Sequence, residues 1–289
     1  MNKQKTVVVL GKFDGVHVAH ARLITRAVSI AKEKNAICLV YSMQKSNVPA
    51  ITDKDKKISI ITGLGADKVV LRELDREFMM LTAEKFVSDI LIGELNACHV
   101  VVGENFRFGK DRSAGVKELG CICRKYGVDV YVLDTVEINS ETVSSTFVKQ
   151  LLSCGNVYLA AEYLGRPFSI NGKISEGKHL GRLLGFPTAN LYPENLEVLP
   201  ANGVYVTKVE HGGKCYPSIT NVGVNPTVEN GKNIKVETHI FGDTCINYGD
   251  EITVEFMEFI RPEIRFESSE QLSTQVEEDK KRARNYHGI

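Results

Sequence analysis

A glycine-rich stretch in the second half of the chain has the composition of a phosphate-binding loop. Residues 172–191 read GKISEGKHLGRLLGFPTANL, with glycines at Gly172, Gly177, Gly181 and Gly185. Glycine has no Cβ and takes positive φ readily, so the backbone can approach a phosphate chain closely. The stretch begins as GxxxxGK, but His179 stands where a P-loop has serine or threonine, and we reject a P-loop. A surface loop with no ligand is the alternative.

Two polar side chains follow this stretch directly. Thr188 and Asn190 are two residues apart, behind Pro187 with its fixed φ. On an extended chain, residues at i and i+2 point to the same side. A hydroxyl and an amide therefore face one way, and this pair is suited to bind Mg²⁺ and a nucleotide.

A second candidate site lies near the N-terminus, in the segment GKFDGVHVAH at residues 11–20. His17 and His20 are three residues apart, which places both imidazoles on one face of the first turn of the helix that we expect there. The N-terminus of a helix favours phosphate through its dipole and its free N–H groups. Two imidazoles there can stabilise charge on a nucleotide α-phosphate or a leaving pyrophosphate. A solvated pair of histidines at a helix start is the alternative.

Alternating apolar runs and amphipathic segments must position these residues in the first half of the chain. The periodicity predicts buried strands at residues 7–10, 37–41, 69–71, 100–102 and 128–133, with helices between them. One helix is expected around Leu23, Ala27 and Ile30, and another after an N-cap at Thr82. The alternation predicts a doubly wound parallel α/β sheet, in which ligands bind beyond the carboxyl ends of the strands. That rule selects the loop at residues 11–20 and the loop GENFRFG at residues 103–109.

The period changes to two in the second half. Short strands are expected at residues 169–174, 203–209, 215–222, 234–240 and 251–259, and they predict a small closed antiparallel β-barrel. Ser268 and Gln271 form a capping box for a C-terminal helix, whose polar surface we interpret as solvated. Helices near residues 145–155 and 157–164 precede a break at Gly165-Arg166-Pro167. We place the domains at residues 1–156 and 157–289.

These motifs together closely resemble the bacterial bifunctional riboflavin kinase/FAD synthetase (FMN adenylyltransferase) family, over almost the whole chain. The glycine-rich stretch ending in Pro-Thr-Ala-Asn is similar to the riboflavin kinase flap. The segment GKFDGVHVAH is similar to the family's GxFDGxHxGH, and GENFRFG to its GxNFxFG. The resemblance implies two ATP-dependent reactions, phosphorylation of riboflavin to FMN and adenylylation of FMN to FAD. It also implies Mg²⁺ as cofactor and flavins as substrates and products.

The resemblance also implies roles for individual residues. Strand alternation alone makes Glu237 an outward-facing polar residue, but in the segment VETHI it matches the kinase's general base. His17 and His20 match the residues of adenylyl transfer, and Thr188 and Asn190 match the Mg²⁺ ligands. The implied nucleotide-binding residues are Gly11, Phe13, Asp14, Gly15, Ser144, Ser145, Thr146, Lys149, Gly172, Gly177, Gly181, Arg182, Gly185 and Pro187. The implied flavin and nucleotide loop, for which a packed loop is the alternative, contains Asn105, Phe106, Arg107, Phe108 and Gly109.

Several departures from the family pattern concern adenylyl transfer. Ala19 replaces a glycine, and residues 41–45 read YSMQK where the family has Phe-x-Pro-His-Pro. Phe147 and Lys149 follow Ser-Ser-Thr where the family has two arginines, and the loss of a bidentate guanidinium weakens phosphate binding. One alternative is therefore a riboflavin kinase with a degenerate, inactive N-terminal domain. An alternative of another class is a non-catalytic flavin-binding or regulatory protein.

Composition sets the remaining expectations. The chain of 289 residues has 36 Lys and Arg against 36 Asp and Glu, so its net charge is zero and gives no electrostatic case for nucleic acid or a membrane surface as partner. No apolar stretch approaches the ~20 residues of a membrane span, and the run at residues 7–10 is too short for a signal peptide. We expect a cytoplasmic transferase that acts on small molecules as a monomer or weak homo-oligomer.

Overall fold

The computed structural model describes residues 4–45, 47–175, 188–193, 198–224, 234–242 and 244–289. The chain forms two compact units, Met1–Ser145 and Thr146–Ile289. The expected domain limits, residues 1–156 and 157–289, stay a prediction. Five residues of the predicted nucleotide-binding set lie outside the described residues, so their roles also stay predictions: Gly177, Gly181, Arg182, Gly185 and Pro187.

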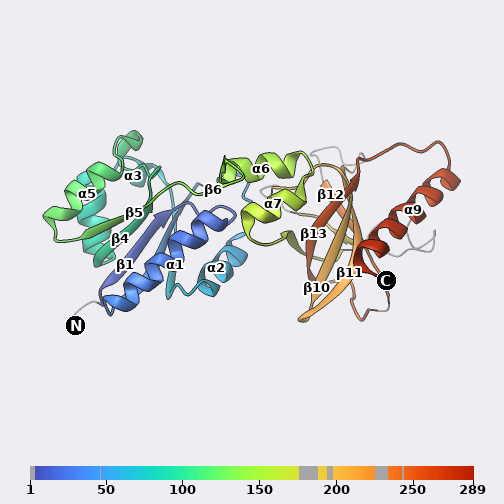
Figure 1. Ribbon diagram of the computed structural model, residues 1–289, viewed down its shortest axis with the longest axis horizontal. Coiled ribbons are helices and arrows are strands. Elements are labelled where there is room, and N and C mark those ends of the chain that lie inside the picture. The colour runs from blue at the N-terminus through green and yellow to red at the C-terminus, as the bar shows by residue number, and fades with distance from the viewer. Residues whose placement is uncertain (1–3, 46, 176–187, 194–197, 225–233, 243) are drawn as a thin grey trace. The chain divides into compact units, whose positions relative to one another are not determined.

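The N-terminal unit contains a five-stranded parallel sheet in the order β3-β2-β1-β4-β5 (Figure 1). Its strands, which confirm the five predicted runs, are β1 (Thr6–Gly11), β2 (Ile37–Gln44), β3 (Lys68–Glu73), β4 (Ala97–Gly103) and β5 (Asp129–Leu133). The connecting helices are α1 (Val18–Glu33), α2 (Lys54–Gly63), α3 (Arg76–Met79), α4 (Ala83–Lys85), the π-helix Phe86–Glu94, the 3₁₀ turn Lys110–Arg112 and α5 (Val116–Lys125). A short hairpin of β6 (Glu137–Ile138) and β7 (Glu141–Thr142) follows.

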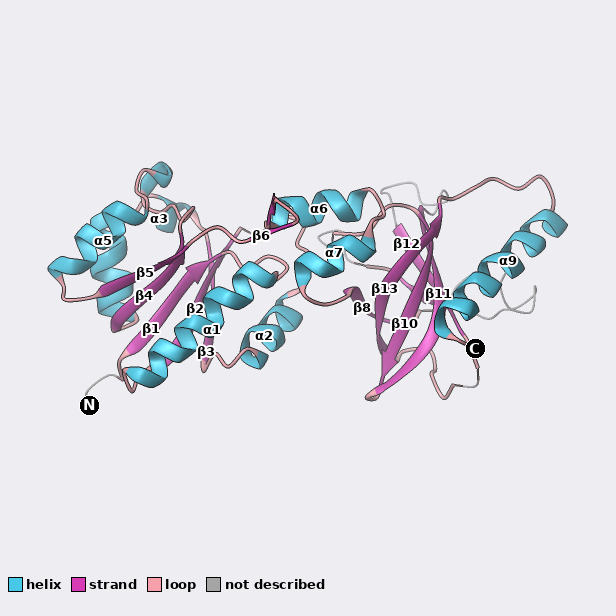
Figure 2. Cartoon of the chain, in the orientation of Figure 1, coloured by secondary structure: helices cyan, strands magenta, loops and turns pink. Residues whose placement is uncertain are grey.

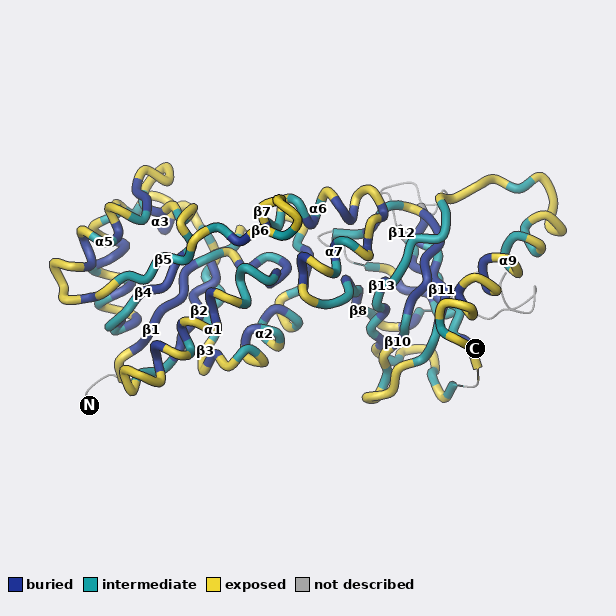
Figure 3. The backbone as a smooth tube through the Cα atoms, viewed as in Figure 1, coloured by how far each residue is buried: buried dark blue, intermediate teal, exposed yellow. Residues whose placement is uncertain are grey.

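Apolar side chains cover both faces of this sheet. On β1, Val7 and Val9 pack with Ile24 of α1, whereas Val8 packs on the opposite side with Leu119 of α5. Successive strand residues point to opposite faces, so a continuous apolar run is what a sheet buried on both sides requires. The buried strands are visible as the dark core of this unit in Figure 3. The predicted doubly wound α/β architecture is confirmed.

The C-terminal unit is an antiparallel sheet of six strands in the order β8-β13-β10-β11-β12-β9 (Figure 2). The strands are β8 (Phe168–Lys173), β9 (Ala189–Leu191), β10 (Gly203–His211), β11 (Lys214–Val224), β12 (Ile234–Ile240) and β13 (Glu251–Arg261). A bridge between Ser175 and Asn190 joins the two edges of the sheet, as the predicted barrel requires. The helices are α6 (Ser145–Ser153), α7 (Val157–Leu164) and α9 (Ser269–His287).

The two faces of this sheet differ in chemistry. One face buries a ladder of hydroxyls, in which Thr220 bonds both Thr207 and Thr238 at 2.8 Å. The other face is apolar where Val206 and Ile219 pack against Ala283 of α9. Because side chains alternate along a strand, Glu237 lies on the α9 side and not beside Thr238. The fold thus turns Glu237 toward the helix.

Candidate active sites

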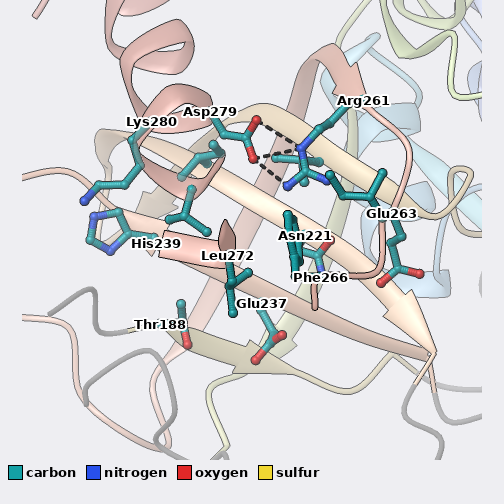
Figure 4. A pocket seen from close by; sticks show the side chains of 14 residues that line it. Thr188, Asn221, Glu237, His239, Arg261, Glu263, Phe266, Leu272, Asp279 and Lys280 are labelled. Carbon is teal, nitrogen blue, oxygen red and sulfur yellow. Dashed lines mark hydrogen bonds and ion pairs between the residues drawn. The ribbon is translucent and has the colours of Figure 1, made fainter. Parts of the chain in front are cut away.

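A cavity of about 350 Å³ lies between the sheet of the C-terminal unit and α9 (Figure 4). Its volume is within the range of small-molecule sites. Strand residues and helix residues contribute opposite walls. The polar lining residues are Thr188, Asn221, Glu237, His239, Arg261, Glu263, Asp279 and Lys280. The structure therefore brings the predicted Thr188 and Glu237 to one cavity.

Strand pairing places Asn190 next to this pair. On β9 and β12, Asn190 is the direct partner of Glu237, so the two side chains share one face of the sheet. Asn190 is only 4% exposed, and its Nδ2 donates to the Thr188 carbonyl at 3.4 Å. Its Oδ1 is buried and has no hydrogen-bond partner among the described residues. A bound cation or a ligand with a donor group can satisfy a buried acceptor of this kind.

Glu237 has a neighbour that the sequence analysis did not foresee. Lys235 donates from Nζ to Glu237 Oε1 at 2.6 Å, and its side chain is 15% exposed. Residues two apart on a strand share a face, so the ammonium lies on the cavity side of the sheet. A charge-assisted hydrogen bond of this length holds the carboxylate in one orientation.

Helix α9 is attached to the sheet by a buried ion pair. Arg261, the last residue of β13, donates from Nε and Nη2 to Asp279 Oδ2 at 3.0 and 2.6 Å. The guanidinium also stacks over Phe266 at 5.9 Å. Our interpretation of the polar helix surface as solvated is wrong at Asp279 and Lys280, which are buried and line the cavity beside Leu272 and Val276. The spacing of Leu272, Val276 and Ala283 is the signal that could have revealed it.

In the N-terminal unit, the two predicted histidines lie together at the start of α1. His17 is the N-cap, one residue before the helix, and its Nδ1 accepts from the backbone N–H of His20 at 3.4 Å. The imidazoles stack with centroids 3.6 Å apart and planes at 12°. In the neutral ring the proton of His17 then lies on Nε2. Burial lowers the pKa of His20 well below its usual value, and nearby His17 and Lys57 lower it further.

The loop before these histidines has an unusual backbone. Phe13 and Gly15 have φ of 51° and 78°, a region that non-glycine residues seldom adopt. The fully buried ring of Phe13 covers Gly11, where an added Cβ would lie 2.9 Å from Phe13 Cζ. At Gly15 a Cβ would lie 3.0 Å from Ile51 Cδ1. Gly11, Phe13 and Gly15 thus shape the loop, and their contact with a nucleotide stays a prediction.

Hydrogen bonds connect this loop to distant parts of the chain. Asp14 Oδ1 accepts from the Ile51 N–H at 2.7 Å, and Ser145 Oγ donates to the Asp14 carbonyl at 2.8 Å. Ser144 and Ser145 are half-buried, and Ser145 begins α6. The predicted serines therefore lie beside the predicted loop within the N-terminal unit.

The remaining predicted residues on α6 belong to the second compact unit. Thr146 is exposed and Lys149 is half-buried. Phe147, at one of the positions where arginine was expected, packs edge-on against Tyr163 of α7 with centroids 4.9 Å apart. The aromatic replacement thus takes part in helix packing.

The loop after β4 is only partly packed. Phe108 is 5% exposed and contacts Phe86 with centroids 5.3 Å apart, and Phe106 stacks on Phe108 at 5.7 Å. Asn105 and Arg107 are exposed, while Gly109 has a φ of 74°. The burial of Phe108 agrees with the packed-loop alternative at that residue. Flavin contact by this loop stays a prediction.

Comparison with known proteins places both units in recognised families. The family model for FAD synthetase matches residues 1–147, and that for riboflavin kinase matches residues 164–287. A bifunctional riboflavin kinase/FMN adenylyltransferase of Escherichia coli K12 is 34% identical over 98% of this chain and 93% of its own length. The corresponding protein of Bacillus subtilis 168 is 31% identical over 98% of this chain and 92% of its own.

One crystal structure is similar over nearly the full length. It is named as a macrolide-efflux protein from Streptococcus pneumoniae, with a TM-score of 0.90 and 29% identity over 99% of this chain and 95% of that chain. In the present structure, no helix among the described residues is long and apolar enough to cross a membrane.

Proposed function

The chain belongs to the bifunctional riboflavin kinase/FMN adenylyltransferase family, and we propose that its two units divide the two reactions between them. The C-terminal unit transfers the γ-phosphate of ATP to riboflavin and forms FMN. The N-terminal unit transfers the AMP part of ATP to FMN and forms FAD and pyrophosphate. Family membership supports these two activities over a kinase with an inactive N-terminal domain and over a flavin-binding protein without turnover.

The observation that carries the kinase assignment is that Thr188 and Glu237 line one cavity, with Asn190 paired directly beside Glu237. In the reaction, the Glu237 carboxylate accepts the proton of the terminal ribityl hydroxyl as its oxygen attacks the γ-phosphorus. Lys235 holds that carboxylate in place. Because the transition state of phosphoryl transfer involves little covalent participation by the protein, positioning and charge supply most of the catalysis.

The donor atoms at this end of the cavity suit Mg²⁺. The metal prefers oxygen ligands, and the buried Oδ1 of Asn190 has no hydrogen-bond partner in the described part of the chain. Thr188 and Asn190 would hold the ion. When bound, Mg²⁺ neutralises charge on the ATP phosphates. The cavity beyond Glu237, lined by Ile219, Phe266 and Leu272, then takes the flavin ring.

For adenylyl transfer, the paired histidines of the N-terminal unit stabilise phosphate charge. An oxygen of the FMN phosphate attacks the α-phosphorus of ATP in line, the bond to the β-phosphate breaks, and its electrons leave with pyrophosphate. His20 is neutral at pH 7 because its pKa is lowered by burial, so its ring donates one hydrogen bond. His17 donates from Nε2, and the N-terminus of α1 adds its dipole.

Two assays on one purified protein test this division. Riboflavin with ATP and Mg²⁺ reports the kinase through FMN, and FMN with ATP and Mg²⁺ reports adenylyl transfer through FAD and pyrophosphate. Glu237→Gln removes the proton acceptor but keeps the side chain's shape, so FMN formation falls by a factor on the order of 10² or more. Riboflavin binding stays near that of the wild type.

The second assay is the internal control, because Glu237 lies in the other unit. FAD formation from supplied FMN is expected to be unchanged in Glu237→Gln. Near-normal FMN formation in this variant would remove Glu237 from the mechanism. A wild-type protein that makes FMN but no FAD would contradict the proposed role of the N-terminal unit.

A further inference from the structure

Lys57 is a buried lysine that the proposed reactions do not yet use. It lies on α2 and is 4% exposed, whereas Lys54 on the same helix is fully on the surface. Burying an ammonium group without full hydrogen bonding is costly, and buried lysines are rare unless they are paired. The position of this charge therefore needs an explanation.

The ammonium group of Lys57 is held between two acceptors. Its Nζ donates to the Lys12 carbonyl at 3.4 Å and to Gln44 Oε1 at 3.2 Å. An ammonium group has three N–H donors. Among the described residues, no further acceptor is bonded to Nζ. One N–H is thus available to an acceptor that the protein does not supply.

The surroundings of Lys57 show where that acceptor would lie. Lys12 is the first residue after β1, in the loop that leads to His17, and Gln44 ends β2. Ligands of such sheets bind at these carboxyl ends. The charge of Lys57 is also close enough to His20 to lower its pKa. The ammonium of Lys57, the imidazole pair and the N-terminus of α1 therefore all lie at the carboxyl ends of the strands.

The charge state of Lys57 fits a contact with an anion. Burial disfavours the charged form of Lys57 and lowers its pKa, an effect that the carboxylate of Asp14 only partly opposes. Both hydrogen-bond partners of Nζ in the described part of the chain are neutral acceptors, so no direct ion pair there neutralises the charge. A phosphate oxygen would supply the missing acceptor and the missing negative charge together.

We propose that Lys57 binds the ATP phosphates in the adenylyl-transfer site, donating its third N–H to a phosphate oxygen while Lys12 and Gln44 hold the ammonium in place. This inference rests on the proposed adenylyl transfer. Lys57 gives up no proton: the FMN phosphate oxygen forms the new bond to the α-phosphorus, and the electrons of the broken bond leave with pyrophosphate. The ammonium stabilises the negative charge that grows on the phosphate oxygens.

The test compares Lys57→Met with Lys68→Met in the full-length protein. Both changes remove one positive charge. Lys68, however, is exposed at the amino end of β3, whereas the proposed site lies at the carboxyl ends of the strands. With FMN supplied and riboflavin omitted, the KM for ATP in FAD formation is measured. Lys57→Met is expected to raise this KM at least tenfold. Lys68→Met and FMN formation from riboflavin are expected to match the wild type.

Two further variants separate charge from structural support. Lys57→Arg keeps the positive charge and is expected to retain more FAD formation than Lys57→Met. Lys57→Gln keeps a hydrogen-bond donor but removes the charge. If Lys57→Met does not fold, Lys57→Gln serves as the test of whether the charge of Lys57 contributes to ATP binding. Its KM for ATP is also expected to rise at least tenfold.

The outcomes distinguish this inference from the function on which it rests. A KM for ATP within threefold of the wild type in Lys57→Gln or in folded Lys57→Met overturns the role of Lys57, and leaves adenylyl transfer intact. A loss of kcat in Lys57→Arg equal to that in Lys57→Met, with an unchanged KM, overturns it also. A wild-type protein that forms FMN but no FAD overturns adenylyl transfer itself.

Discussion

The two candidate sites are built in different ways. In the C-terminal unit, strand register places Asn190 opposite Glu237, and the docked helix α9 closes the cavity. In the N-terminal unit, a short loop with positive φ at Phe13 and Gly15 leads into the paired histidines. One site is therefore fixed by a regular sheet, and the other by a strained loop and the side chains that support it.

This difference shows how far a motif can be interpreted residue by residue. On a strand, the period of two fixes which side chains share a face, and the segment VETHI, by its resemblance to the kinase family, singled out Glu237 on that face. In the loop, the motif GKFDG combines residues that can contact a ligand with residues that only hold the backbone. Phe13 is fully buried over Gly11, which makes both of them supports. Changes in the two sites should accordingly have different consequences.

The largest effect expected in the N-terminal site comes from His20→Gln. The change replaces the imidazole stacked on His17 with an amide that cannot hold its N–H in the same place, so FAD formation falls about 10²-fold, or about 2.7 kcal/mol in the barrier. FMN formation from riboflavin is expected to be unchanged. This pattern is the reverse of that expected for Glu237→Gln, which loses FMN formation and keeps FAD formation. The measurement is kcat/KM in the two assays on the same protein.

His99→Gln is the matched control for that variant. His99 is another partly buried histidine of the N-terminal unit, and it lies near the amino end of β4, away from the carboxyl ends. Its FAD formation should equal that of the wild type. If His20→Gln retains FAD formation within threefold of the wild type, the imidazole pair has no part in the reaction.

Much of the fold could be predicted because its signals are local. The apolar runs around Val8 and Val101 predict strands, and Thr82 and Ser268 cap helices as expected. Strand β9 falls on the extended segment expected at Thr188 and Asn190, although its three residues were not among the strands predicted for the barrel. The helix expected after Thr82 is present, but its π-helical register over Phe86–Glu94 was not predicted, since that register leaves no mark in the sequence.

The site was less predictable where it depends on tertiary contacts. Lys57 is one of three lysines in KDKK, and nothing local distinguishes the buried one from the exposed Lys54. The pairing of Arg261 with Asp279 joins residues that are distant in sequence. By contrast, strand alternation paired Thr188 with Asn190, and the family motif added Glu237 to them. Short-range patterns thus located the reacting groups, and long-range packing supplied their partners.

A smaller effect is expected from Asp279→Asn, which tests whether the kinase site needs its docked helix. The change leaves the Arg261 guanidinium buried without its carboxylate, so the free energy of unfolding of the C-terminal unit falls by about 2 kcal/mol. The KM for riboflavin rises, because α9 forms one wall of the cavity. Chemical denaturation and the FMN assay measure the two effects.

Glu258→Gln provides the comparison for this variant. Glu258 also joins β13 to α9, through Arg282 at 2.6 Å, but both side chains are well exposed, at 38% and 52%. Exposed pairs contribute about 0 to 1 kcal/mol, so this variant should stay close to the wild type. An equal fall in the free energy of unfolding in the two variants would show that the Arg261–Asp279 pair contributes no more to stability than the exposed pair.

The smallest expected effect concerns Phe147, the second residue of the C-terminal unit. Phe147→Arg restores a guanidinium at a position where the family has arginine, so the KM for ATP in FAD formation should fall a few-fold. The same change removes the edge-on contact with Tyr163, which lowers the free energy of unfolding by about 1 kcal/mol. Phe147→Leu loses the ring without gaining the charge, so it should show only the loss of stability.

An unchanged or raised KM in Phe147→Arg would mean that another cation already compensates for the missing arginine. Repeating the measurement in the Lys57→Met background tests that explanation directly, because the gain from Phe147→Arg should then be larger than in the wild type.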